Sequence, residues 1–189
     1  MIDARNTLYA LTAAPALPLG DLTRGNGLYA LRDHRGVIRY IGISAAAAGF
    51  RNRIHDRHVT GSEERSHKFS FAYNVGRMWR AHRDDSADAK LAKAFRTHFI
   101  RRHCTASILA VAGACPLTKR ELEWIEAEVK ALAPLEMRSW DGVFEPEPET
   151  NELVDALIDE LGLSPAQRTA LDRQANAAPA GRLPSSVEA

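Results

Sequence analysis

The stretch Gly27-Leu-Tyr-Ala-Leu-Arg32, followed by Asp33-His-Arg-Gly36 and Val37-Ile-Arg-Tyr-Ile-Gly42, decides the fold of this chain. The two outer segments are rich in the aromatic, aliphatic and β-branched residues that favour strands. The four residues between them include Asp and Gly, which favour turns. The pattern predicts a β-hairpin with a four-residue loop.

The register that this loop favours pairs Arg32 with Val37. Tyr29 then lies opposite Tyr40, and the two phenol rings share one side of the ribbon with Cβ atoms about 5 Å apart. Two further residues share that side and leave room there for a ligand, because they carry no side chain: Gly27 and Gly42.

Hydrophobic periodicity predicts the remaining elements of the central region. A helix is expected over 50–59, where Phe50, Ile54 and His58 follow each other at intervals of four. A second helix is expected over 89–103, a strand over 107–111 and a third helix over 117–132.

The C-terminal region has its own pattern. Glu145-Pro-Glu-Pro-Glu-Thr150 contains no apolar residue and two prolines, which is typical of an extended linker. A short helical pair follows, with apolar residues from Leu153 to Leu161 and a capping-box sequence in Ser164-Pro-Ala-Gln167. Disorder is expected from about Ala175. The predicted organisation is a domain over 1–143, a linker over 144–150 and a helical extension over 151–189.

The charge of the chain is divided along its length. The whole sequence has 25 Lys and Arg against 24 Asp and Glu. Residues 51–103 carry thirteen basic and six acidic residues, whereas residues 141–189 carry three and ten. A basic middle beside an acidic tail suggests a polyanion site next to a solvating appendage, or simply two solvated faces.

Composition also excludes some classes of protein. The longest nearly apolar run, 108–115, is much shorter than the roughly 18–20 residues that a membrane span requires, and the first residues have no apolar core of a secretory signal. Cys104 and Cys115 fit no metal-binding pattern, so reduced thiols in a cytoplasmic protein are expected.

Two short motifs and two helices occur in a particular order. Gly27-Leu-Tyr29 is followed by Tyr40-Ile-Gly42, then by an Arg/His helix and later by a Glu-rich helix. Over residues 26–142 this order resembles the GIY-YIG nuclease family. The resemblance implies an α+β fold with a three-stranded antiparallel sheet flanked by helices, and cleavage of DNA phosphodiesters with one divalent metal, Mg²⁺ or Mn²⁺.

The resemblance also implies roles for single residues. Tyr29 would relay a proton from the attacking water, and Tyr40 would help to hold the nucleophile or the phosphate. Arg53 would neutralise the scissile phosphate, and His58 corresponds to the family's histidine, one residue further along than usual. Three residues complete the motifs: Gly27, Gly42 and Ser44.

The metal-binding glutamate is expected on the helix over 117–132. Glu121 is chosen because it lies near the apolar stripe and precedes Leu-Glu-Trp-Ile, which resembles the family pattern. Glu126 is the second choice. Met137 stands where the family commonly has asparagine, so a nucleic-acid-binding module without catalysis is the main alternative.

The basic segment offers candidates for nucleic-acid contact. They are Arg51, Arg57, His67 and Lys68. Aromatic residues alternate with cations over 68–88, which suits either a nucleic-acid surface or a long covering loop with its own apolar cluster. The acidic helical tail could instead dock a protein partner or cover the basic surface. No membrane partner is expected.

Overall fold

The computed structural model describes residues 3–110 and 117–179, which form two compact units. The first unit combines residues 1–57 with 101–142, and the second combines 58–100 with 143–189. This division differs from the predicted one, because the basic insertion after residue 57 belongs with the acidic C-terminal part. The first unit has fourteen Lys and Arg against ten Asp and Glu, so it carries a net positive charge.

The first unit is built on a four-stranded antiparallel sheet in the order β1-β4-β2-β3. The strands are β1 (Leu17–Pro18), β2 (Gly27–Arg32), β3 (Ile38–Ser44) and β4 (Thr105–Ala110). The α+β class with helices flanking an antiparallel sheet is confirmed, whereas the expected number of three strands is wrong. The extra strand, β1, has two residues and ends in proline at the sheet edge, so no strand pattern marks it. Residue 111 of the predicted strand lies outside the described residues.

The hairpin forms as predicted, but its strand register differs from the predicted one. The backbone N–H of Asp33 donates to Val37 O at 2.9 Å, so the loop has three residues and Gly36 takes a positive φ of 79°. A bulge beside Arg32 adds a second shift, and Tyr29 therefore pairs with Gly42. A register shift of one residue moves the side chains of one strand to the other face relative to its partner. Two such shifts cancel, so Tyr29 and Tyr40 still lie on the same face of the sheet.

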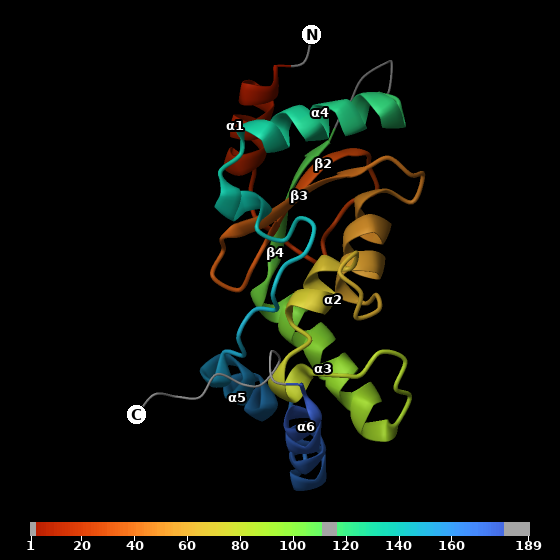
Figure 1. Ribbon diagram of the computed structural model, residues 1–189, viewed down its shortest axis with the longest axis vertical. Coiled ribbons are helices and arrows are strands. Elements are labelled where there is room, and N and C mark those ends of the chain that lie inside the picture. Colours follow the sequence, from red (N-terminus) through yellow and green to blue (C-terminus); the bar gives the residue numbers. More distant parts are fainter. Residues whose placement is uncertain (1–2, 111–116, 180–189) are drawn as a thin grey trace. The chain divides into compact units, whose positions relative to one another are not determined.

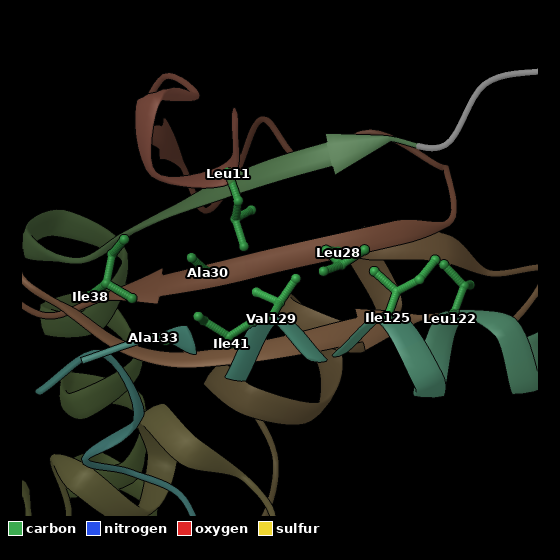
Figure 2. Packing of buried hydrophobic residues seen from close by; sticks show 9 residues of the cluster. All are labelled: Leu11, Leu28, Ala30, Ile38, Ile41, Leu122, Ile125, Val129 and Ala133. Atoms are coloured by element: carbon green, nitrogen blue, oxygen red, sulfur yellow. The ribbon is translucent and has the colours of Figure 1, made fainter. Parts of the chain in front are cut away.

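The hydrophobic core of the first unit lies between the sheet and two helices, α1 (Ala4–Ala13) and α4 (Lys119–Leu132). The two helices contact each other and cover neighbouring parts of the sheet, α1 over β4 and β2 and α4 over β3 and β2 (Figure 1). Figure 2 shows how α4 contributes Leu122, Ile125 and Val129 to this core. The apolar periodicity of the helix predicts a packed stripe of these three residues and Leu132, but Leu132 is 44% exposed and that part of the prediction is wrong. A 3₁₀ turn, η3 (Leu135–Arg138), follows α4.

The Arg-rich helix follows β3. This element, η1 (Arg51–Val59), has the wider π-type pattern of hydrogen bonds, and its last two residues are grouped with the second unit. Phe50 and Ile54 are fully buried, which confirms the predicted apolar stripe. The backbone N–H of Phe50 donates to Gly25 O and ties the start of the helix to the loop before β2.

The second unit is helical in its described part. It contains α2 (Lys68–Ala72), η2 (Gly76–Met78), most of α3 (Ala87–His103), α5 (Asn151–Glu160) and α6 (Pro165–Ala177). The predicted C-terminal helical pair is present, and Ser164 and Gln167 form the expected capping box. α6 continues beyond the point where disorder was predicted, and Ala175 is buried in it.

Burial decides between the two interpretations of residues 68–88. Phe69, Phe71 and Tyr73 are buried, as is Lys68, whose ammonium lies 5.2 Å from the centre of the Phe144 ring. Buried rings offer no face on which a base could stack, so the covering cluster is favoured over a nucleic-acid surface. In the described ranges, no helix is long and apolar enough to cross a membrane.

Candidate active site

Two tyrosines of the hairpin meet on the face of the sheet opposite the main core. Tyr29 and Tyr40 have ring centroids 6.1 Å apart at an interplanar angle of 44°. They are diagonal neighbours, since Tyr29 pairs with Gly42 and Tyr40 pairs with Leu31. Tyr29 is fully buried and Tyr40 nearly so.

Gly42 provides the space for both rings. A Cβ atom at this position would lie 2.6 Å from the Tyr29 hydroxyl and 2.6 Å from Cε1 of Tyr40. We expect Gly42→Ala to displace both rings and to lower the free energy of unfolding by about 1–3 kcal/mol, the usual cost of overpacking. Gly20→Ala is the matched control, because nothing lies within 4 Å of its added Cβ. Denaturant titration of both variants measures the difference, and equal stability would contradict this account of Gly42.

Arg53 reaches this tyrosine pair from η1. Its guanidinium donates a hydrogen bond to the Tyr29 side chain, and its charge acts on both phenols. Its Nε is buried and has no hydrogen-bond partner among the described residues. A buried donor of this kind is costly unless a ligand accepts from it.

The surroundings keep both phenols protonated. Burial raises the pKa of Tyr29 well above its ordinary value, and the nearby Arg53 only partly opposes this. Burial also raises the pKa of Tyr40, against the lowering effect of Lys130. At neutral pH each hydroxyl can therefore donate a hydrogen bond to a ligand or to a neighbouring group.

A pocket of about 430 Å³ opens beside these residues, which we call the tyrosine–arginine pocket. Tyr40, Arg53 and Ser44 line it, whereas the fully buried Tyr29 does not. The Ser44 hydroxyl is buried and, within residues 3–110 and 117–179, has no hydrogen-bond partner. The remaining lining residues with polar side chains are Asn52, Arg57, Lys119, Glu123 and Glu126.

Glu121 does not line this pocket. Its carboxylate accepts hydrogen bonds from the backbone N–H and the hydroxyl of Thr118, both at 2.7 Å, and closes a capping box at the start of α4. These hydrogen bonds lower its pKa. Glu126, the second choice from the sequence, does line the pocket.

Glu126 is held by a lysine one turn further along α4. The Lys130 ammonium lies 2.8 Å from Glu126 and 3.1 Å from Asp141. It also lies 4.7 Å from the centre of the Tyr40 ring, where it makes a cation–π contact. Lys130 thus connects the carboxylate to the tyrosine pair.

The other predicted site residues occupy different places. His58 is fully buried, and its Nδ1 accepts a hydrogen bond from the backbone N–H of Lys68 within the second unit. His67 contacts Ser62 at 2.8 Å in the same unit. Gly27 is a buried residue at the start of β2. Arg57 lines the tyrosine–arginine pocket, whereas Arg51 lines a neighbouring one.

Four polar residues of the site were not predicted from the sequence. They are Asn52, Lys119, Glu123 and Lys130. Lys130 follows Glu126 at the i, i+4 spacing that favours an ion pair on a helix, which is a signal that the sequence does contain. Asn52 and Lys119 carry no such signal.

The described residues contain no group of three His, Cys, Asp or Glu side chains that could together hold a metal ion. Comparisons of the chain with protein-family models, with curated proteins and with solved structures found no match.

Proposed function

We propose that the first unit is a DNA endonuclease of the GIY-YIG type, and that it cleaves phosphodiesters in the tyrosine–arginine pocket. The observation that carries this proposal is Arg53, which lines the pocket with a buried Nε that lacks a partner. A guanidinium matches the geometry of phosphate oxygens, and the orphan Ser44 hydroxyl is a second donor in the same pocket. The sheet and flanking helices agree with the α+β fold that the resemblance implies.

The residues of the pocket suit different parts of the reaction. In hydrolysis a water oxygen bonds to phosphorus and releases a proton to solvent, the bond to the leaving oxygen breaks, and the leaving oxygen takes up a proton. Arg53 would stabilise the negative charge that develops on the phosphate. The protonated Tyr40 hydroxyl can donate to a phosphate oxygen or to the leaving group.

Tyr29 takes a different role from the expected proton relay. It is fully buried and does not line the pocket, but it accepts a hydrogen bond from Arg53. Its raised pKa also keeps the phenol protonated at neutral pH, and a protonated hydroxyl cannot take the proton of the attacking water. We therefore assign Tyr29 as a positioning residue that orients the Arg53 guanidinium.

We further propose that Glu126, and not Glu121, holds the divalent metal of this pocket. Mg²⁺ commonly binds through only one or two protein carboxylates, with water and substrate oxygens completing its shell. Glu126 would hold the ion, and Glu123, which also lines the pocket, can add oxygen ligands. The ion would supply positive charge and a more acidic water.

A DNA-binding module without catalysis is the second candidate. Lys130 already neutralises Glu126, and Met137, at the position of the family's asparagine, packs against the hydrophobic core. Both features reduce the number of groups available for chemistry. Binding of DNA without cleavage under any metal would favour this candidate.

The test of the nuclease proposal is cleavage of plasmid and branched DNA in Mg²⁺ or Mn²⁺ by the full chain. We expect Arg53→Ala to lower the rate about 10²–10³-fold, the usual loss when one transition-state donor is removed. Arg120→Ala, an exposed arginine of α4 that lines neither pocket, is the matched control and should cleave normally. Equal rates for the two variants, or no cleavage by the unmodified chain, would refute the proposal.

A further inference from the structure

A second hollow of about 650 Å³ lies beside the tyrosine–arginine pocket. We call it the arginine pocket, because Arg24 and Arg51 contribute its two cations. Ala47 and Ala48 form apolar wall, and Asn52 and Asp56 complete the lining. Every lining residue belongs to the first unit.

The two pockets are neighbours that share a wall. Asn52 lines both of them. On the helix η1, Arg51 faces the arginine pocket and Arg53 the tyrosine–arginine pocket, since successive helical residues point in different directions. The loop before the helix alternates similarly, with residues 45, 46 and 49 on one pocket and residues 47 and 48 on the other.

The chemistry of the arginine pocket favours an anion. Both arginines are exposed at its mouth, and the alanine wall leaves space for a ligand. Its single carboxylate, Asp56, accepts from Asn52 Nδ2 at 3.1 Å and contacts His55 Nδ1 at 2.8 Å. The hydrogen bond with His55 lowers the pKa of Asp56, and the positive charge of Arg51 also acts on Asp56 and helps to lower it. Asp56 therefore orients the shared Asn52 amide, and the two arginines still outnumber the one carboxylate of the pocket.

We propose that the arginine pocket binds the phosphodiester next to the one that is cut, so that the substrate is a continuous DNA strand and not a single nucleotide. This inference rests on the proposed nuclease function of the neighbouring pocket. Two neighbouring anion sites suit a polymer that carries a phosphate at every step, and the shared wall residue Asn52 makes the two pockets direct neighbours. Asn52 would lie between the two phosphates.

Salt-dependent DNA binding tests this assignment. Anisotropy of a labelled 20-base-pair duplex, measured in EDTA between 50 and 200 mM KCl, gives the slope of log Kd against log salt. Each phosphate contact that is lost reduces the magnitude of this salt slope by about 0.9. We expect Arg24→Gln/Arg51→Gln to lower the slope by one to two, and Arg5→Gln/Arg120→Gln to leave it unchanged. The control pair removes two exposed arginines of the same unit that line neither pocket.

A competition experiment separates a strand from a lone phosphate. Thymidine 3′,5′-bisphosphate carries two phosphates at the spacing of a strand, whereas thymidine 5′-monophosphate carries one. We expect the bisphosphate to displace the labelled duplex at least tenfold better from the unmodified chain, and Arg24→Gln/Arg51→Gln to remove this preference. The proposal would be overturned by any one of three results. These are equal competition by both nucleotides, equal salt slopes for both double variants, and no duplex binding by the unmodified chain at 50 mM KCl.

The failure of this proposal differs from the failure of the nuclease proposal. If Arg53→Ala stops cleavage but the salt slopes of the two double variants agree, only the arginine pocket is wrongly assigned. If neither the unmodified chain nor any variant cuts DNA, but Arg24→Gln/Arg51→Gln lowers the salt slope of DNA binding, the arginine pocket is correctly assigned as a phosphate-binding site and the nuclease proposal is refuted.

Discussion

Glu126→Gln is expected to slow DNA cleavage about 10³-fold, while Glu121→Gln cleaves at the rate of the unmodified chain. The loss corresponds to several kcal/mol of transition-state stabilisation, which is what a catalytic metal ion contributes. Glu126 lines the tyrosine–arginine pocket, and its amide replacement keeps the shape of the side chain. Glu121 instead accepts hydrogen bonds from Thr118 at the start of α4.

The measurement is single-turnover cleavage with saturating protein, together with titration of Mn²⁺ into each variant by calorimetry. We expect Glu126→Gln to lose both cleavage and metal binding, and circular dichroism to show an unchanged fold. Loss of cleavage in Glu121→Gln with normal cleavage in Glu126→Gln would contradict the assignment. The two variants form a matched pair, since both replace a glutamate of the same helix by glutamine.

The sequence and the structure favour different glutamates for a physical reason. The angular position of Glu121 near the apolar stripe of α4 favours it as a ligand, but Glu121 is also the third residue of the helix, where its carboxylate can fold back onto Thr118. The sequence Thr118-Lys-Arg-Glu121 is a capping-box signature, which indicates that this carboxylate is engaged at the helix start. Position on a helical wheel does not distinguish a ligand from a cap.

The tyrosine pair shows which part of a hairpin can be predicted from sequence. Alternation along the strands placed Tyr29 and Tyr40 on one face, which is confirmed. The partner of each tyrosine was wrong, because the three-residue loop and the bulge at Arg32 each moved the register by one residue. Alternation determines the face, while loop and bulge geometry determine the partner.

The division into two units could not be predicted from sequence. The acidic stretch 145–150 has the composition of a free linker, yet Glu149 is almost fully buried. Its partner, Arg77, precedes it by 72 residues, and composition contains no information on such a distant ion pair. Local patterns did predict the two C-terminal helices, because capping and periodicity act over a few residues.

Glu149 anchors the acidic segment within the second unit. Its carboxylate accepts from the backbone N–H of Arg77 at 2.6 Å and from Arg77 Nε at 2.7 Å. Arg77 also pairs with Asp155 on α5. Gly76 has a positive φ of 47°, and an added Cβ there would overlap the Glu149 carboxylate. The close approach of carboxylate and backbone therefore requires glycine at this position.

Glu149→Ala is expected to lower the free energy of unfolding by about 3 kcal/mol. Removing one partner of a buried ion pair typically costs 3–5 kcal/mol, and the lower end applies because the Arg77 side chain is 16% exposed and keeps its ion pair with Asp155. Glu145→Ala is the matched control, since this glutamate of the same segment is exposed. Denaturant unfolding of the full chain measures both variants. Equal stability of the two would show that the segment is a free linker, as its composition suggests, whereas a selective loss in Glu149→Ala makes residues 144–150 a structural part of the second unit.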